Sequence, residues 1–398
     1  MDMDMENLTA VRVLGRGAMG TVFLVTDSTS PPDRCCCCCP FALKVVEKST
    51  FQTKPEAERR ARWEVSVISS LSHQHPFLPA LLGTIETVDL LGWAVPYCPG
   101  GDLNALRYRQ SDSIFSPSAI RFYVSEIVCA LEHLHRMGIV YRDLKPENVL
   151  IQQSGHVMLT DFDLSRALKK GDESSTSSLS ADVGDAEEGK SQRRNLTRLI
   201  SVGMGLRKAK SARVSPVSRR KASISGERSN SFVGTEEYVS PEVVLGAGHE
   251  FAVDWWALGV LTYEMAYGRT PFRGRDRKET FHNVLTRPPE FVGKRSALTD
   301  LISQLLEKDP TRRLGFDGGA TEIKKHAFFR GLRWDLLTEV SRPPFLPEDD
   351  LTTLTARNRL DIREHFQKLR QKPYSPSTSM SSSPSSDWRR SVSSWTEF

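Results

Sequence analysis

Long apolar runs are missing from this chain of 398 residues. Its most apolar stretch, residues 251–267, is shorter than the roughly 20 residues that cross a bilayer, and it contains Asp254 and Glu264. We therefore expect a buried helix there and not a membrane span. Residues 1–6 are acidic where a secretory signal carries basic residues, so we also expect no signal peptide.

A zinc-binding pattern of cysteines is absent as well. Five of the seven cysteines form the run Cys35–Cys39, and Cys98 and Cys129 lie far from it. Adjacent cysteines cannot all ligate one metal ion, so we expect a reduced, intracellular protein without a zinc site. We interpret the run as a surface loop; S-acylation and redox sensing are the alternatives that remain open.

Two neighbouring segments each carry charge of almost entirely one sign. Residues 172–188 carry six acids and no base, whereas residues 190–228 carry twelve Lys or Arg and one acid, Glu227. The two segments together account for the whole formal net charge of +5, so the basicity does not belong to the rest of the chain. The basic segment favours binding to anionic lipid or nuclear import, with a solvated linker as the third interpretation. We expect no specific binding to nucleic acid.

A dense polar motif is present at residues 141–148, Tyr-Arg-Asp-Leu-Lys-Pro-Glu-Asn, directly before an apolar strand. Asp143 can accept or orient a hydroxyl proton, Lys145 can face the charge that grows on a γ-phosphate, and Asn148 can ligate a metal ion. These groups are the ones needed to transfer a phosphoryl group to a hydroxyl. An ordinary polar turn is the alternative, which the length of the motif disfavours.

A glycine-rich hairpin lies near the start of the chain, at Gly15, Gly17 and Gly20, between the strand-like runs 10–14 and 21–26. Glycine lets backbone N–H groups come close to phosphates. A Rossmann turn would need a helix immediately afterwards, but residues 21–25 have a strand pattern, so we favour a hairpin over phosphates.

A lysine and a glutamate that we expect to form an ion pair follow this hairpin. Lys44 lies on a third expected strand, and residues 56–71 predict a helix with apolar residues at helical spacing. Glu64 is the acid on that helix that we expect to pair with Lys44. A lysine that merely extends along a strand to solvent is the alternative interpretation.

These motifs together resemble those of the eukaryotic protein kinases, and Lys145 indicates the serine/threonine branch. Asp161-Phe162-Asp163 stands where such kinases have Asp-Phe-Gly. The Asp at position 163, and the 67 residues that separate this motif from Ser231, resemble the plant AGC VIII group, of the short-N-terminus UNICORN-like or oxidative-signal-inducible type. Asp163 should restrict the backbone and disfavour the inactive flip that glycine permits.

The resemblance implies an α+β fold with two lobes. The kinase domain should span residues 8–329, with an N-lobe at about 8–95 and a C-lobe at about 99–329. An insertion at about 168–228, rich in Ser, Gly and charge, should be disordered. Residues 330–398 should form an AGC-type C-terminal tail.

The resemblance also implies ATP and Mg²⁺ at the site. It assigns catalysis to Asp143, Lys145, Lys44 and Glu64, and the metal ligands to Asn148 and Asp161. The ATP-binding residues that it implies are Leu14, Gly15, Arg16, Gly17, Ala18, Met19, Gly20, Val22, Ala42, Lys44, Pro96, Cys98, Asp102 and Leu150. Asp102 suits either the ribose hydroxyls or an arginine of a peptide substrate.

Regulation and substrate selection are implied in the same way. Ser231 is the expected activating phosphosite, with Arg142 placed to receive the phosphate. Substrates are expected to carry Arg upstream of the target Ser or Thr, read by the residues Thr235, Glu147, Glu237 and Glu264. The C-terminal aromatics Trp395 and Phe398 resemble the hydrophobic motif that docks the phosphoinositide-dependent activating kinase; a random aromatic terminus is the alternative.

Two structural roles and one competing function complete the expectations. Glu242 should pair with Arg313, and Asp254 should hold the catalytic-loop backbone. The competing function is a pseudokinase scaffold that binds partners through the basic insertion, which the intact catalytic set argues against. A Walker-type nucleotide hydrolase is a still weaker alternative, because its phosphate-binding motif does not occur. We expect the protein in the cytoplasm or nucleus, with peripheral attachment to the plasma membrane as a further alternative.

Overall fold

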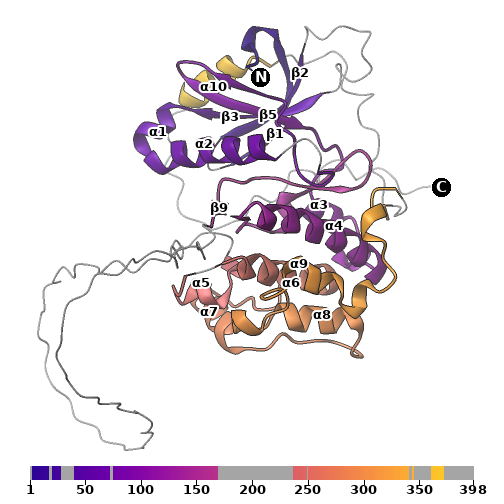
Figure 1. Cartoon of the computed structure of the whole chain (residues 1–398). Helices are drawn as coiled ribbons and strands as arrows, with labels where there is room; N and C mark the ends of the chain where they lie inside the picture. The colour runs from indigo at the N-terminus through magenta and orange to yellow at the C-terminus, as the bar shows by residue number, and fades with distance from the viewer. Residues whose placement is uncertain are drawn as a thin grey trace, which may run out of the picture.

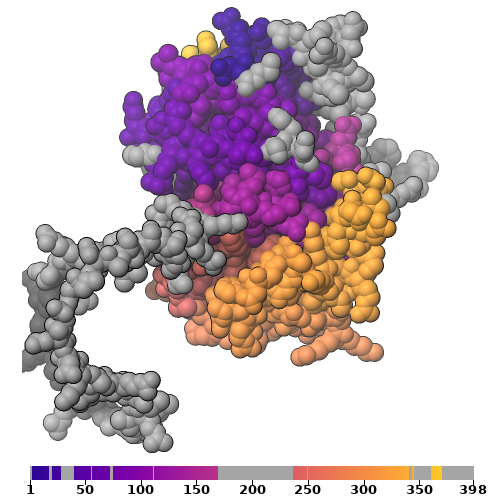
Figure 2. Space-filling model, in the orientation of Figure 1, coloured from indigo at the N-terminus to yellow at the C-terminus, as the bar shows by residue number. Residues whose placement is uncertain are grey.

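The computed structural model describes residues 2–17, 20–27, 40–71, 75–168, 236–248, 250–339, 343–344 and 360–371. These residues form a small lobe built around a sheet and a large lobe built from helices, stacked one above the other in Figure 1 and in Figure 2. The two-lobed α+β fold is therefore confirmed. No helix in this described part of the chain is long and apolar enough to cross a membrane.

The small lobe contains one antiparallel five-stranded sheet in the order β1-β2-β3-β5-β4. Its strands alternate between two faces, as the two-residue period of a strand requires. On β3, Leu43 and Val45 are buried on one face, whereas Ala42 and Lys44 are half-buried on the other. The strands are β1 (Leu8–Arg16), β2 (Thr21–Asp27), β3 (Phe41–Glu47), β4 (Gly83–Glu86) and β5 (Leu90–Pro96).

The helix expected at residues 56–71 is α2 (Pro55–Ser70), which follows the short helix α1 (Ser49–Thr53). A proline at its first position and two acids in its first turn suit a helix N-terminus. Val67 and Ile68 are buried in the main core cluster together with Trp93 of β5. This packing fixes α2 beside the sheet, and with it the position of Glu64.

The opposite face of the sheet is covered by residues near the N-terminus and by α10, a helix late in the chain. Ile362 and Phe366 of α10 (Ile362–Gln371) are buried against Phe23 of β2, and Met3 and Met5 pack on the same apolar cluster. In Figure 1, α10 and the N-terminus lie at the far side of the sheet from α2. The sequence pattern did not predict α10.

The large lobe is organised around α4 (Pro117–Arg136) and α6 (Ala252–Tyr267). Ser116 caps α4 by accepting from the Ala119 N–H, and serine is among the residues that favour this position. The buried stripe of α4 contains Ile120, Tyr123, Ile127, Leu131 and Leu134, each 0% exposed.

The apolar stretch at 251–267 is indeed a buried helix, α6. Near its first turn, Arg313 donates two hydrogen bonds to Glu242, at 2.7 and 2.9 Å, and a third to the carbonyl of Ala252. The predicted Glu242–Arg313 pair is confirmed, and it is buried.

The remaining elements surround the junction of the lobes or complete the large lobe. They are α3 (Leu103–Tyr108), β6 (Ile139–Val140), β7 (Val149–Ile151), β8 (Val157–Leu159), β9 (Arg166–Ala167), α5 (Pro241–Val244), α7 (Arg277–Thr286), α8 (Ala297–Leu305) and α9 (Gly319–Lys324).

Candidate active site

Lys44 lies between two carboxylates in a partly buried chain of charges. Its Nζ donates to Glu64 Oε2 at 2.7 Å and to Asp161 Oδ1 at 2.8 Å. Burial opposes the lysine charge, but the two carboxylates more than offset it and raise the pKa of Lys44. Burial raises the pKa of Glu64 to about 7 against the attraction of Lys44. Lys44 therefore keeps its positive charge between α2 and the turn after β8.

Asp161 occupies a backbone conformation that is uncommon for its type. Its φ is +61°, in the left-handed region. This turn brings its carboxylate to Lys44, which outweighs burial and lowers the pKa of Asp161. Phe162 is fully buried in the same cluster as Val67 and Ile68 of α2. The Asp-Phe-Asp motif is thus held by Lys44 at its first residue and by the apolar core at its second.

The catalytic loop brings Asp143, Lys145 and Asn148 together. Asp143 Oδ2 accepts from Lys145 Nζ and from Asn148 Nδ2, each at 2.8 Å. Burial raises the pKa of Asp143, which is 6% exposed, although both partners act against that rise. A partly desolvated carboxylate with fixed donors on one oxygen can orient a hydroxyl through the other.

The backbone of this loop is held from below by Asp254 of α6. The carboxylate accepts from Tyr141 N at 2.8 Å and from Arg142 N at 2.7 Å, and His135 Nε2 contacts it at 2.8 Å. Arg142 has φ +71°, a strained conformation that these bonds stabilise. The predicted structural role of Asp254 is confirmed.

The lower face of the sheet forms an apolar roof over the same space. The strand register places Val22 opposite Lys44 and Val95 opposite Ala42, so all four side chains share one face. They are half-buried, whereas their neighbours Leu43 and Val45 are fully packed on the other face. Leu14 and Leu150 are half-buried too. A roof of this kind fits a flat aromatic ligand such as adenine.

The glycines of the hairpin are the candidate phosphate-binding residues beneath this roof. A Cβ at Gly20 would meet the carbonyl oxygen of Val45 at 2.3 Å, so the fold itself requires that glycine. A Cβ at Gly15 or Gly17 would meet nothing within 4 Å. The packing of the described residues does not require these two glycines, and their open backbone leaves room for an anion. Arg16 at the end of β1 is exposed.

The connection between the lobes passes the same space. Pro96 ends β5, and the Cys98 side chain is buried with its Sγ 3.8 Å from Met158 Sδ. A Cβ at Gly100 would meet Ile151 at 2.6 Å, so the connection lies tightly against β7. Asp102 caps α3 by accepting from Ala105 N at 2.7 Å, a role that the sequence did not predict.

The expected metal ligands carry the oxygen donor atoms that Mg²⁺ prefers. The described residues contain no group of three His, Cys, Asp or Glu that could hold a metal ion alone. Mg²⁺, however, usually takes one or two protein oxygens together with substrate phosphates. Asn148 commits its amide nitrogen to Asp143, which leaves its carboxamide oxygen as the ligand atom, and Asp161 adds a carboxylate. The donor set fits a magnesium–nucleotide complex.

The expected substrate-reading acids are partly brought together and already have partners. Burial raises the pKa of Glu147, and the nearby Glu264 and Asp102 carboxylates add to that rise. Glu264 forms an ion pair of 3.0 Å with Arg107 and accepts from the Tyr238 hydroxyl. Glu237 accepts from Thr270 Oγ1 at 2.5 Å instead.

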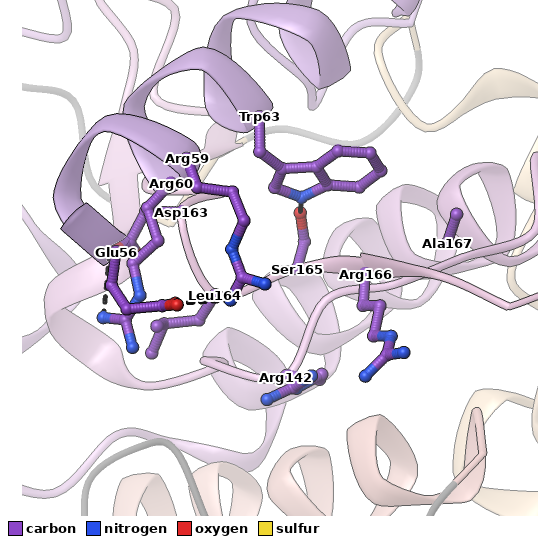
Figure 3. A pocket seen from close by; sticks show the side chains of 10 residues that line it. All are labelled: Glu56, Arg59, Arg60, Trp63, Arg142, Asp163, Leu164, Ser165, Arg166 and Ala167. Carbon is purple, nitrogen blue, oxygen red and sulfur yellow. Dashed lines mark hydrogen bonds and ion pairs between the residues drawn. The ribbon is translucent and has the colours of Figure 1, made fainter. Parts of the chain in front are cut away.

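A cleft of about 400 Å³ separates α2 from the segment that follows Asp161. Figure 3 shows Trp63 reaching across it to Ser165, with Arg142 and Arg166 on the opposite wall from α2. The indole Nε1 donates to Ser165 Oγ at 2.9 Å. Burial lowers the pKa of Arg142, and repulsion from Arg166 adds to this. The wall is therefore electropositive and suited to an anion.

Several predicted residues lie outside the described residues. These are Ala18, Met19, Ser231, Thr235, Trp395 and Phe398, together with the basic segment 190–228. The structure in turn adds Arg60, Trp63, Ser165 and Arg166, which the sequence did not single out. The spacing of Arg60 and Glu64, four residues apart on one helix, was the available signal.

Comparison with known proteins agrees with this geometry. The family model described as "Protein kinase domain" matches residues 8–184 and 218–329. The serine/threonine-protein kinase UCNL of Arabidopsis thaliana is 57% identical over 395 residues, covering 96% of this chain and 93% of the relative. The serine/threonine-protein kinase UCN of Arabidopsis thaliana is 55% identical, covering 94% and 92%. The serine/threonine-protein kinase OXI1 of Arabidopsis thaliana is 46% identical, covering 87% and 80%. With a family model over most of its length and relatives that match it nearly end to end, this chain belongs to the protein kinase family, as a serine/threonine kinase of the plant AGC VIII group.

Proposed function

We propose that this kinase transfers the γ-phosphoryl group of ATP to Ser or Thr of Arg-rich proteins by means of the residues assembled between its lobes. Lys44 holds the α- and β-phosphates, and Glu64 holds Lys44 in place. Asp143 orients the acceptor hydroxyl, and Lys145 stabilises the charge that develops on the transferred group.

One observation carries this proposal. Lys44 contacts Glu64 and Asp161 at 2.7 and 2.8 Å simultaneously, so a small-lobe helix and the metal-binding turn meet at one cation. The Asp143–Lys145–Asn148 network lies on the loop that precedes this turn. Positioning and electrostatic stabilisation are what phosphoryl transfer needs, and these contacts supply both.

Asn148 and Asp161 are the residues that would hold Mg²⁺. The bound ion would supply a positive charge to the phosphate oxygens. The chain contributes the rest: the half-buried roof excludes water from the nucleotide, and Asp254 fixes the loop that carries Asp143.

Phosphorylation of an Arg-rich Ser peptide with Mg²⁺-ATP tests the proposal directly. We expect turnover by the purified chain, and a fall of at least about 100-fold in Asp161→Ala and in Asp143→Asn. Absence of turnover, even after phosphorylation by an upstream kinase, would favour a scaffold that binds partners through its basic segment.

The preference for arginine is supported by the acids at the substrate side of the loop. The carboxylate of Glu147 is near the negative charges of Glu264 and Asp102, so an arginine placed among them would relieve their repulsion. We expect Glu147→Gln to raise the KM for an Arg-rich peptide at least about threefold, and to leave the KM for ATP unchanged. Equal effects on both KM values would contradict this assignment.

Activation is proposed to occur by phosphate on Ser231. The electropositive wall of Arg142 and Arg166 is a suitable receptor for it. Ser231→Ala should then abolish the gain in turnover that an activating kinase produces. The terminal Trp395 and Phe398 are proposed to dock the phosphoinositide-dependent activating kinase, so a chain shortened before Trp395 should be phosphorylated more slowly at Ser231.

The basic segment 190–228 is proposed to bind anionic lipid, which would place part of the protein at the plasma membrane surface. Nuclear import is the other function that its charge supports, and the cytoplasm is the remaining location. Imaging of the whole chain and of a version with the twelve basic residues replaced by Gln separates these outcomes.

A further inference from the structure

Asp163, the third residue of the Asp-Phe-Asp motif, faces a positive charge from α2. Its Oδ2 lies 3.8 Å from Arg60 Nη1, and its side chain is 9% exposed. Arg60 is 37% exposed and lies one turn before Glu64 on the same helix, so both side chains project from one face. The carboxylate at 163 is thus buried beside a helix residue and not in solvent.

The neighbouring residues repeat this arrangement. Asp161 reaches α2 through Lys44 and Glu64, and Ser165 accepts from Trp63 at 2.9 Å. Alternate residues of the segment, at 161, 163 and 165, therefore face α2. Phe162, between them, is buried in the core. The segment is a turn, closed by the hydrogen bond that Ser165 N donates to the Phe162 carbonyl at 3.0 Å, and Asp163 supplies the middle one of its three polar contacts toward α2.

The backbone at position 163 does not need a glycine. Among the described non-glycine residues with positive φ are Arg142 and Asp161, but Asp163 is not one of them. An Asp is therefore accommodated there without the strain that would make glycine preferable. A side chain at this position can contribute to the contact with α2, which glycine cannot.

We propose that Asp163 is a positioning residue that, together with Arg60, ties α2 to the metal-binding turn and so keeps Glu64 at Lys44. The inference rests on the proposed function for its kinetic consequences only. Asp163 is not among the residues proposed to contact ATP, Mg²⁺ or the acceptor hydroxyl, and it acts through α2. The glycine that other kinases usually have at this position could not form the contact with Arg60.

A double-mutant cycle tests the pair. We expect Asp163→Asn and Arg60→Gln each to lower kcat about threefold to tenfold. The kcat of the double variant should be no lower than that of the less active single variant. Arg60→Lys, which keeps the positive charge, should recover most of the loss. Asp163→Gly should behave like Asp163→Asn.

The matched control for the cycle is Arg62→Gln. Arg62 lies on the same helix but pairs with Glu58 and Glu86. Its effect should therefore be additive with that of Asp163→Asn. Additive effects of Asp163 and Arg60, or full activity in Asp163→Gly, would overturn the proposal.

Hydrogen exchange of the α2 backbone amides gives a second readout that does not need activity. Exchange in α2 should be faster in Asp163→Asn and in Arg60→Gln than in the parent chain. Parent-like exchange in both variants would overturn the proposal even if the chain had no kinase activity. Faster exchange in a chain without turnover would instead retain the pair and reject the proposed function.

Discussion

Lys44 is held by two carboxylates at once, which makes it the residue whose loss changes the site most. Replacement by Met leaves Glu64, 3% exposed, close to Asp161 without a cation between them. We expect Lys44→Met to lower turnover at least about 100-fold, and to reduce the free energy of unfolding by up to about 3 kcal/mol. Peptide phosphorylation and chemical denaturation measure the two effects.

Lys48→Met is the matched control for this change. Lys48 pairs with Glu86, and both side chains are more exposed than those of the Lys44–Glu64 pair. Its replacement should leave turnover within about twofold of the parent, because surface pairs contribute little. A Lys44→Met chain that kept more than about a tenth of the parental turnover would contradict the assignment of Lys44.

Lys308 is a second residue with an unusual environment. Its Nζ is buried and has no hydrogen-bond partner among the described residues, and it lies 3.6 Å from the centre of the Phe272 ring and 4.9 Å from that of Trp256. Burial, followed by repulsion from Arg313, lowers the pKa of Lys308 to about 7. The aromatic faces attract the charged form and limit this effect.

The lowered pKa predicts a pH dependence of stability. The unfolded chain binds the Lys308 proton more tightly than the folded chain, so the free energy of unfolding should rise as the pH increases from about 7 to about 10. Lys308→Met removes this titration. We expect the variant to be about 1 kcal/mol more stable than the parent at pH 6.5, an excess that disappears near pH 10. Denaturation at both pH values measures it, and a constant difference would contradict it.

The residue pairs that sequence motifs specify were the ones that could be predicted. Glu64, Glu242 and Asp254 have the partners expected of them, because the resemblance to protein kinases implied both members of each pair. The contact between Arg60 and Asp163 could not be predicted in this way. A basic residue on an amphipathic helix usually faces solvent, and only folding brings the turn after β8 beside it.

Helices with a cap and a long apolar stripe were predictable as elements. The α4 helix has the N-cap Ser116 and five stripe residues at 0% exposure, and α2 differs from its expected range by one residue at each end. The α10 helix could not be predicted from its pattern. Its three apolar residues are surrounded by charge, and the surface that they bury lies more than 250 residues away in the sequence.

Because α10 covers the outer face of the sheet, it should stabilise the hairpin that β1 and β2 form. Phe366 is 5% exposed, with its ring centre 6.0 Å from that of Phe23 on β2. Leu360 N, just before the helix, donates to the carbonyl of Ala10 on β1 at 2.9 Å. We expect Phe366→Ala to reduce stability by about 2–4 kcal/mol and to raise the KM for ATP.

The control for this helix is Gln367→Ala, at an exposed position. Thermal unfolding and hydrogen exchange of β1 and β2 distinguish the two variants. Exchange in β1 and β2 should be faster only in Phe366→Ala. Equal exchange in the two variants would show that α10 does not support the hairpin.

At the scale of the whole molecule, the site exists only where the two lobes meet. Gly100 N donates to the carbonyl of Ile151 at 3.0 Å, and Ile151 N donates to that of Gly101 at 2.8 Å, so the connecting segment is tied to the large lobe. The resemblance of the motifs to those of protein kinases predicted two lobes and the residues between them. It could not predict the cleft beside α2, because that cleft depends on how the turn after β8 packs.

The net charge of the molecule belongs to residues 172–228, so they can be removed to separate two properties of the chain. Replacing them by a Gly/Ser linker of about 15 residues removes the whole formal charge of +5. Binding to vesicles that contain anionic lipid should fall at least about 100-fold, since each basic residue near such a surface contributes about 1 kcal/mol. Peptide phosphorylation should stay within about threefold of the parent, because loop length has little effect on stability. Replacing only the acidic residues 172–188 is the control, and it should strengthen vesicle binding. If vesicle binding survived the larger replacement, the lipid-binding surface would have to lie on the folded lobes.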